Sequence, residues 1–386
     1  MRSVAYVANN DVVLLQSGCT YLPALLDAIG AARHEILYET YIYSEDKTAR
    51  AVTEALLGAA KRGVKVRVVV DWFGTGNRTA CRLGEEFAAG CVHYRMFNPW
   101  FKRGVARSHR KICVVDGELA FVGGINTNDD LLCDYKPYDP LPGPRWDFAV
   151  QVRGPLVEEI HREAQAQWMR VGRLNVVRRM KLFRDLRKPP PSQGDRPMRA
   201  GFVVRNNLRN RRTIQRTYLQ AIGQARSRVL MATPYFAPGR KFRDALCRAA
   251  RRGVDVCLLI GVGEFRMQDA VAYSFYPQLL AAGVRIVEYR ATQLHGKVAV
   301  VDNDWATVGS SNCDGLSLFV NQEANVVVRD AGFAATLARQ IQLGIEEGVP
   351  VGLDDLRQLG WVRRTGHEIA YFLYKLTMRI FTIGYA

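Results

Sequence analysis

Two histidines in this 386-residue chain stand in the same short pattern of residues. Each is followed at the second position by a lysine, then by four apolar residues and an aspartate. After six more residues come Gly-Gly or Gly-Ser, one further residue and an asparagine. A single copy would arise by chance on many strands, whereas two copies with identical offsets indicate a shared function. The residues are His109, Lys111, Asp116 and Asn126 in the first copy, and His295, Lys297, Asp302 and Asn312 in the second.

The spacing within each copy predicts a small binding surface for a phosphate group. On a strand, a histidine and a lysine two positions apart point to the same face. Residues 116–117 and 302–303 are Asp-Gly and Asp-Asn, which favour turns, so each copy is predicted to be a strand, a tight turn and a returning strand. The returning strand would bring the asparagine near the lysine, and the two would supply directed N–H donors and positive charge.

Two such surfaces facing each other would place two histidines at one phosphorus atom. One histidine can attack phosphorus as a nucleophile, and the other can protonate the departing oxygen. Different partners push the pKa values of two adjacent imidazoles apart, which these separate roles require. Each ring then needs an acceptor on its other nitrogen, and the downstream carboxylates Asp147 and Glu323 are the candidates.

The elements that must position these residues also occur twice. Residues 28–43 resemble 221–236, and residues 55–70 resemble 245–260; the second pair predicts a helix, a glycine stop and a β-branched strand. Alternating helices and strands with short connections favour α/β layers. Matching segments are separated by about 190 residues, which is too long for a solenoid repeat and predicts a duplicated domain.

Composition excludes several classes of protein. The 48% of hydrophobic residues excludes a wholly disordered chain, and the eight cysteines form no C-x-x-C pair or zinc-type spacing. Neither a spanning helix nor a signal peptide is predicted, which indicates a cytoplasmic protein with reduced thiols. The net charge of +17 predicts a polyanionic partner, such as nucleic acid, an anionic lipid surface or a phosphorylated substrate.

The positive charge is concentrated in one segment. Residues 170–216 contain fifteen lysines and arginines against two acids, which accounts for +13 of the net charge. Within this segment, residues 188–197 (KPPPSQGDRP) cannot continue a helix or a central strand. We therefore predict an N-terminal lobe at 1–185, a basic, Pro-rich linker at 186–200 and a C-terminal lobe at 201–350. Two alternatives remain for the basic segment: a solvated connector or a contact for phosphates.

The C-terminal residues 351–386 are predicted to form an amphipathic, membrane-associating tail. One helical stripe of the last twenty residues is apolar, yet tyrosines and other apolar residues lie on the opposite side, interrupted by Lys375 and Arg379. An interfacial helix fits this pattern. The alternative is a terminal helix packed on the core.

The paired motifs resemble those of the phospholipase D superfamily. Further residues resemble the bacterial cardiolipin synthases, most closely the short, B-type group without N-terminal membrane helices. The resemblance covers roughly residues 10–345. The residues that carry it are Leu37-Tyr-Glu-Thr-Tyr-Ile-Tyr43, Glu45-Asp-Lys47, the second motif at 294–312, Leu316-Ser-Leu318 and Asn321-Gln-Glu-Ala-Asn-Val326.

This resemblance implies an α/β fold of two lobes related by a pseudo-twofold axis. Each lobe would be a mixed β-sheet flanked by helices, with one active site between them and neither a metal nor a cofactor. His109 would form a phosphohistidine and His295 would act as acid and base, although the reverse assignment stays open. Lys111, Lys297, Asn126 and Asn312 would hold the phosphate, and Asp147 and Glu323 would orient the histidines. Asp116 and Asp302 belong to the catalytic motif as structural or electrostatic supports.

The resemblance predicts a phosphatidyl transferase that makes cardiolipin from phosphatidylglycerol or a related donor. Its partners would be phospholipids and an anionic membrane surface, and it would lie peripherally on the cytoplasmic face of the bacterial inner membrane. A nuclease or a phospholipid hydrolase of the same superfamily is the alternative, and a non-catalytic phosphate-binding scaffold is less consistent with two intact motifs. Residues 98–107 form a segment shorter than expected, which leaves the acceptor alcohol open. The oligomeric state is also left open.

Overall fold

The computed structural model describes residues 4–134, 139–172, 180, 198–206, 210–358 and 360–382. The first half of the chain forms a seven-stranded sheet in the order β1-β8-β7-β6-β2-β3-β4. Strands β2, β3 and β4 are parallel, and the other neighbours are antiparallel. The strands are β1 (Asp11–Gln16), β2 (Glu35–Thr40), β3 (Lys65–Asp71), β4 (His93–Phe97), β6 (Ile112–Val115), β7 (Leu119–Gly123) and β8 (Phe148–Arg153).

Helices cover both faces of this sheet. One face packs against α1 (Ser17–Ala31), α2 (Lys47–Lys61) and α4 (Asn77–Ala89), and the other packs against α5 (Leu156–Val171). Three short elements, α3 (Trp72–Thr75), η1 (Pro99–Phe101) and β5 (Lys102–Val105), lie in the connections that follow β3 and β4.

The second half repeats this arrangement with eight strands in the order β18-β13-β12-β10-β14-β15-β17-β9. Its outer face packs against α7 (Thr213–Gln224), α8 (Arg240–Arg251) and α10 (Tyr276–Ala281), and its inner face against α12 (Ala331–Glu347). The strands are β9 (Arg199–Arg205), β10 (Arg228–Thr233), β12 (Asp255–Gly261), β13 (Arg285–Tyr289), β14 (Val298–Val301), β15 (Trp305–Gly309), β17 (Glu323–Arg329) and β18 (Val349–Pro350). The remaining elements are β11 (Phe236–Ala237), α9 (Arg266–Tyr273), β16 (Cys313–Asp314), α11 (Gly315–Phe319), α13 (Leu353–Gln358) and α14 (Trp361–Thr382).

The duplicated α/β fold predicted from the sequence is confirmed. The parallel strands β2, β3 and β4 correspond to β10, β12 and β13, and the antiparallel β6, β7 and β8 correspond to β14, β15 and β17. The predicted glycine stops are also present, because Gly63 and Gly253 follow α2 and α8 with φ of 89° and 88°. A glycine accepts this left-handed conformation without steric cost, so each helix can end and the next buried strand can begin.

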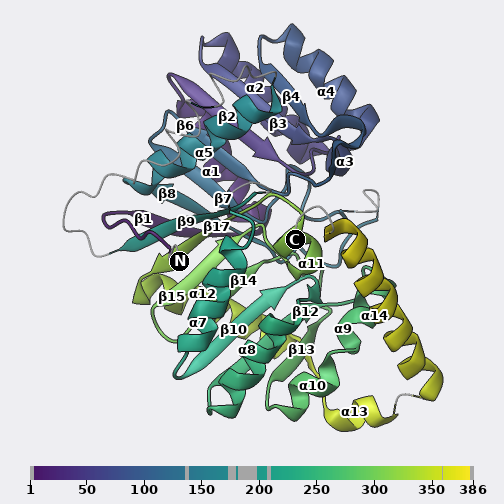
Figure 1. The fold of residues 1–386 in the computed structure, drawn as a ribbon. Coiled ribbons are helices and arrows are strands. Elements are labelled where there is room, and N and C mark those ends of the chain that lie inside the picture. Colours follow the sequence, from purple (N-terminus) through teal and green to yellow (C-terminus); the bar gives the residue numbers. More distant parts are fainter. Residues whose placement is uncertain are drawn as a thin grey trace.

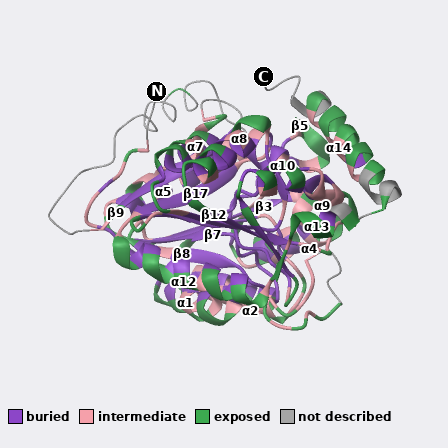
Figure 2. Cartoon of the chain, turned by 90° about the horizontal axis from the view of Figure 1, so that it is seen from below, coloured by how far each residue is buried: buried purple, intermediate pink, exposed green. Residues whose placement is uncertain are grey.

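The two lobes share one hydrophobic core. A single buried cluster contains Val114 and Val150 from the first sheet, Val300 and Val326 from the second, and apolar residues of α5 and α12. Figure 1 shows the two sheets one above the other, with β8 and β17 near the boundary between them. Figure 2 shows this interior as a continuous buried region beneath exposed helices. The common core holds the ends of β6, β7, β14 and β15 in a defined relation, so a site between the lobes can be rigid.

Part of the basic segment 170–216 belongs to the fold itself. Arg170 pairs with the buried Glu163 at 2.9 Å, and Arg205 donates hydrogen bonds to the backbone carbonyls of Phe319 and Asn321. These two arginines therefore stabilise the structure. The predicted linker at 186–200 lies outside the described residues, apart from Met198 and the first two residues of β9.

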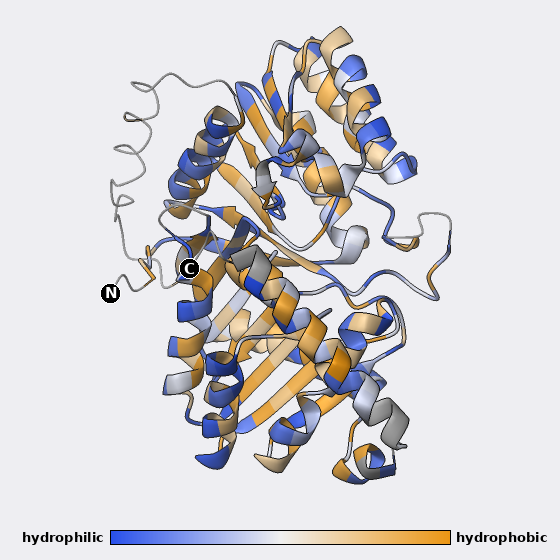
Figure 3. Cartoon of the chain, turned by 45° about the vertical axis from the view of Figure 1, so that its right-hand side comes forward, coloured by the Kyte–Doolittle hydropathy of each residue, from blue (hydrophilic) through white to orange (hydrophobic). Residues whose placement is uncertain are grey.

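The helix α14 is packed on the C-terminal lobe and exposed at the same time. The Tyr374 hydroxyl accepts a hydrogen bond from the N–H of Gly315 at 2.8 Å and donates one to the carbonyl of Ala237 at 3.1 Å. The apolar side chains of Ile369, Phe372, Leu373 and Leu376 are exposed. Figure 3 shows α14 lying across the outside of the lobe with hydrophobic segments along it. One side of α14 is therefore packed on the core, and the apolar side chains of the other side are exposed.

Candidate active site

Each histidine of the repeated pattern is held by a carboxylate from the other half of the chain. His109 Nδ1 lies 3.2 Å from Glu323 Oε2, and His295 Nδ1 lies 2.6 Å from Asp147 Oδ2. All four side chains are buried. The sequence named both carboxylates as candidates without pairing them to a ring. The structure brings the four residues into one site between the lobes and pairs them crosswise.

Backbone hydrogen bonds between the lobes place the histidines. The His109 N–H donates to the carbonyl of Gln322, and the His295 N–H donates to the carbonyl of Trp146, both at 2.9 Å. The two histidines therefore precede strands β6 and β14, where the sequence predicted that they would lie within strands. The expected strand, turn and returning strand begin three residues later, because the backbone at each histidine is bonded to the other lobe.

The difference between Gly-Gly in the first motif and Gly-Ser in the second has a local cause. A Cβ atom on Gly124 would lie 2.2 Å from Asp147 Oδ1, so a glycine is needed for this carboxylate to approach. At the corresponding position of the second motif, the Ser310 hydroxyl donates to Glu323 Oε2 at 2.5 Å. Each motif therefore ends against the carboxylate of its own lobe, which in turn reaches the histidine of the other lobe.

Without a bound anion, the surroundings keep both imidazole rings neutral near pH 7. Burial and then Lys111 lower the pKa of His109, and burial and then Lys297 hold the pKa of His295 well below its usual value. A neutral ring that donates its Nδ1–H to a carboxylate carries a lone pair on Nε2. Each Nε2 can therefore attack phosphorus or accept a proton from an alcohol.

Two buried lysines give the site its positive charge. Lys111 Nζ donates to the carbonyl of His109 at 2.9 Å, and Lys297 Nζ donates to the carbonyl of His295. Burial and the proximity of Lys297 lower the pKa of Lys111 to about 7, and burial lowers that of Lys297 to about 8. An anionic phosphate would relieve the repulsion between the two ammonium groups, so the two lysines favour the binding of an anion.

We expect Lys111→Met to abolish activity and to stabilise the protein without substrate. Because the folded-state pKa lies below the usual 10.5, the folded protein resists the charged form, and its free energy of unfolding rises between about pH 7 and pH 10.5. The fall of the Lys111 pKa from 10.5 to about 7 corresponds to roughly 5 kcal/mol at most against its charged form. Thermal unfolding should show the variant above the wild type at pH 6.5, with the gap narrowing by pH 9.5. A variant less stable than the wild type at pH 6.5 would contradict this account.

The two asparagines end the motifs at the site. Asn126 and Asn312 are buried, and Asn126 Oδ1 accepts a hydrogen bond from the N–H of Ile42 at 3.2 Å. This contact fixes the orientation of the Asn126 amide, which leaves its N–H₂ group as the donor for a ligand.

Asp116 and Asp302 lie away from the reacting groups. The Asp116 carboxylate accepts the N–H groups of Arg33, His34 and Glu35 at 2.8–2.9 Å, directly before β2. Asp302 accepts those of residues 226–228 before β10 in the same way. The repeated pattern includes both residues in the predicted catalytic motif. In the structure both carboxylates hold the turn before a strand, and Asp302 also accepts the Ser227 hydroxyl at 3.0 Å, which favours a supporting role.

We expect Asp116→Ala to cost stability and to leave the turnover of the folded enzyme nearly unchanged. Three backbone N–H groups lose their acceptor, which costs about 1–3 kcal/mol. Partial burial alone would raise the pKa of Asp116, but the three hydrogen bonds lower it below 3.8. The wild type should therefore lose this contribution as the pH falls through the folded-state pKa. Denaturant unfolding at pH 7 and pH 3 measures the effect, and a large fall in the turnover of folded enzyme would refute the support role.

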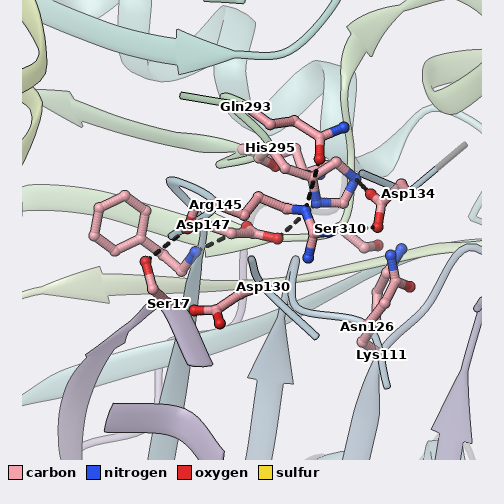
Figure 4. Close-up of polar contacts among 12 residues, drawn as sticks. Ser17, Lys111, Asn126, Asp130, Asp134, Arg145, Asp147, Gln293, His295 and Ser310 are labelled. Atoms are coloured by element: carbon pink, nitrogen blue, oxygen red, sulfur yellow. Dashed lines mark hydrogen bonds and ion pairs between the residues drawn. The ribbon is translucent and has the colours of Figure 1, made fainter. Parts of the chain in front are cut away.

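Several residues of the site were not identified from the sequence. The Tyr41 ring packs 4.7 Å from the His109 ring, and the Ser310 carbonyl lies 3.0 Å from His109 Nδ1. On the other side, Arg145 and Asp134 lie next to His295 (Figure 4). Tyr41 belongs to the quoted segment 37–43, and Arg145 is two residues before Asp147, but no repeated spacing marks Asp134. Its position depends on the path of the loop between β7 and β8.

Among the described residues, no group of three or more His, Cys, Asp or Glu side chains is arranged to hold a metal ion. Within the same part of the chain, no helix has both the length and the apolar character to span a membrane.

Comparison with known proteins agrees with this geometry. Residues 25–132 and 218–343, which together make up more than half of the chain, match the family described as cardiolipin synthase, PLD-like domain. The chain is 38% identical over 335 residues to cardiolipin synthase B of Escherichia coli (strain K12), covering 85% of this chain and 78% of that protein. It is 30% identical over 376 residues to cardiolipin synthase A of Pseudomonas putida, covering 94% of this chain and 74% of the relative.

A solved structure has the same fold. The phosphatidylserine synthase of Haemophilus influenzae superposes with a TM-score of 0.67 over 96% of this chain and 93% of that one, at 13% identity. The residue pattern, the shared site and these matches agree: the chain belongs to the cardiolipin synthases of the phospholipase D superfamily.

Proposed function

We propose that this protein makes cardiolipin by moving a phosphatidyl group from one phosphatidylglycerol to a hydroxyl of another. The crosswise pairing of His109 with Glu323 and His295 with Asp147 is the observation that carries the proposal. It supplies two imidazoles with free Nε2 atoms at one buried site, as a two-step displacement at phosphorus requires.

In the first step, His109 Nε2 attacks phosphorus and forms a phosphohistidine. The negative charge of the bound phosphate raises the pKa of His295 above its value without substrate, so its Nε2 takes up a proton before the reaction. The departing glycerol oxygen takes this proton, and in the second step the neutral His295 removes a proton from the incoming hydroxyl. Lys111, Lys297, Asn126 and Asn312 hold the phosphate oxygens. Asp147 and Glu323 keep each ring in the tautomer that presents Nε2 to the substrate.

A phosphodiesterase acting on nucleic acid is the second candidate, and the net charge of +17 favours it. The exposed apolar face of α14 favours a lipid substrate, because such a face has no use on a nucleic-acid surface. The phospholipid hydrolase alternative uses the same first step with water as the acceptor.

One assay separates these candidates. The purified protein is incubated with phosphatidylglycerol vesicles or with single- and double-stranded DNA, in buffer without added metal. We expect cardiolipin and glycerol from the lipid and no cleavage of the DNA. Phosphatidic acid as the only lipid product would support the hydrolase, and cleaved DNA with unchanged lipid would support the nuclease.

We further propose that the protein docks peripherally on an anionic membrane, namely the cytoplasmic face of the bacterial inner membrane. The exposed side of α14 carries four large apolar side chains, and Lys375 on the same helix faces solvent. In the N-terminal lobe, Phe73, Trp100 and Phe101 are also exposed, and the Arg107 guanidinium lies 3.2 Å from the centre of the Phe73 ring. Arg107 is two residues before His109, so this second apolar patch adjoins the site.

Vesicle binding tests this docking with a matched pair of variants. Leu376 on α14 and Leu343 on α12 are exposed to almost the same extent, 48% and 47%. We expect Leu376→Asp to weaken binding to phosphatidylglycerol vesicles about tenfold or more, since one buried leucine is worth roughly 1.5–3 kcal/mol. Leu343→Asp adds the same charge elsewhere and should bind as the wild type does. Equal binding by both variants would contradict docking through α14.

A further inference from the structure

The loop between β7 and β8 places a carboxylate beside His295 that the steps above do not use. Asp134 Oδ2 lies 3.6 Å from His295 Nε2, whereas Asp147 binds the opposite nitrogen, Nδ1 (Figure 4). The Asp134 side chain is fully buried, and its Oδ2 atom has no hydrogen-bond partner. A buried carboxylate oxygen without a hydrogen-bond partner destabilises the folded protein. A bound ligand that donates a hydrogen bond to Oδ2 would explain why this oxygen lies beside the reacting nitrogen.

The other oxygen of Asp134 is firmly held. Arg145 Nη2 lies 3.0 Å from Oδ1, and Asn128 Nδ2 donates to the same oxygen at 2.5 Å. Arg145 is itself anchored, because its Nε donates to Gln293 Oε1 at 2.9 Å. This support fixes the direction of the carboxylate and turns Oδ2 toward His295.

The carboxylate is also kept charged. Burial alone would raise the pKa of Asp134, but Arg145, His295, Asn128 and Lys297 together lower it. An ionised carboxylate accepts hydrogen bonds and donates none. Because it would repel the phosphate oxygens, its ligand should be a neutral hydrogen-bond donor. The simplest such donor is a hydroxyl group.

We propose that Asp134 forms a subsite for the accepting alcohol and selects a 1,2-diol, the arrangement of hydroxyls at the free end of a glycerol headgroup. The attacking hydroxyl lies at His295 Nε2, and the neighbouring hydroxyl donates a hydrogen bond to Asp134 Oδ2. The 3.6 Å between the two acceptors suits two oxygens joined through adjacent carbons. This inference rests on the proposed function, because it assigns a residue to the second step of that reaction.

The step balances without another reactant. His295 Nε2 removes the proton of the attacking hydroxyl, whose oxygen forms a bond to phosphorus as the bond from phosphorus to His109 Nε2 breaks. His109 leaves as a neutral imidazole, and the proton stays on His295 for the next cycle. Asp134 remains ionised throughout and acts as a positioning residue, which lowers the chance that water takes the place of the alcohol.

The test compares two alcohols that differ by one hydroxyl. Vesicles of phosphatidylglycerol are incubated with enzyme and equal concentrations of 1,2-propanediol and 1-propanol, and mass spectrometry measures both phosphatidyl alcohols and phosphatidic acid. We expect the wild type to favour the diol by on the order of 10- to 100-fold, as for one hydrogen bond to a charged group. Asp134→Asn should bring the ratio close to one and raise the share of phosphatidic acid among the products, because water then competes more easily with the alcohol.

Asp130→Asn is the matched control. Asp130 lies in the same loop, but its carboxylate accepts the N–H of Gly18 at 2.7 Å, so this variant should keep the diol preference. If Asp134→Asn lowers all three products in the same proportion, or keeps the wild-type ratio, the subsite is refuted. Thermal unfolding of the variants shows whether a proportional fall comes from lost structure, which would make Asp134 a support of Arg145 only. A wild-type enzyme that forms no transfer product would overturn the proposed function and the subsite together, whereas cardiolipin synthesis without a diol preference would overturn the subsite alone.

Discussion

His109→Ala and His295→Ala should each reduce cardiolipin formation by at least about 10⁴-fold. Losing one acid or base typically costs 10²–10⁴-fold, and here one ring is also the nucleophile whose covalent intermediate divides the reaction into two steps. Rates with phosphatidylglycerol vesicles measure the loss. Intact-mass spectrometry after a denaturing quench at neutral to mildly alkaline pH, where a phosphohistidine survives, should detect a phosphatidyl adduct on the wild type and none on His109→Ala.

His161→Ala is a suitable control for these variants. His161 also pairs with a carboxylate, Glu35 Oε1 at 2.6 Å, but this pair lies at the start of β2, at the other end of that strand from Tyr41. Its loss should leave the turnover of folded enzyme nearly unchanged. Full activity in either active-site variant would refute the two-histidine mechanism, and an adduct that persists in His109→Ala would assign the nucleophile to His295.

Glu323→Gln and Asp147→Asn should each reduce the rate by on the order of 10²–10⁴-fold with little change in fold. An amide in place of the carboxylate can donate a hydrogen bond to Nδ1, which favours the tautomer with its proton on Nε2. A protonated Nε2 can neither attack phosphorus nor accept a proton. Initial rates and circular dichroism measured on the same samples separate lost chemistry from lost structure.

The crosswise pairing predicts which steps of the reaction each of these two variants slows. Glu323→Gln affects His109, so adduct formation should slow, although the residue follows His295 in the chain. Asp147→Asn affects His295, which acts in both steps, so adduct formation and attack by the accepting alcohol should both slow. Glu35→Gln, which alters the remote pair with His161, is the control and should retain activity. A Glu323→Gln variant with the adduct rate of the wild type would contradict the observed pairing.

Much of the fold was predictable because its signals are local. The glycines that end α2 and α8, the β-branched strands after them and the turns at Asp116 and Asp302 each depend on a few neighbouring residues. Repetition of these segments at a constant offset then predicted two similar lobes. The predicted strand boundary at the histidines was wrong by three residues, since their backbone is bonded to the other lobe rather than to β7 or β15.

The last helix shows a different limit of sequence reasoning. Apolar residues on both sides of 367–386 allowed either an interfacial helix or one packed on the core, and hydrophobicity alone does not distinguish them. The structure separates the two sides, because Tyr371 and Tyr374 pack on the C-terminal lobe while Phe372 and Leu373 face outward. Which side of α14 is buried depends on the surface of the lobe against which the helix packs.

The sequence by itself predicted which residues make up the candidate site: two copies of one pattern name both histidines, both lysines and both asparagines, because residues of one type recur at equal spacing after a duplication. The tertiary structure decided how they combine. Glu323 reaches His109 across 214 residues of chain, and Asp147 reaches His295 across 148. Asp134 reaches the same site from the loop between β7 and β8, which is not part of the repeated pattern. Such contacts depend on how two sheets pack against a common core, and no local spacing encodes that packing.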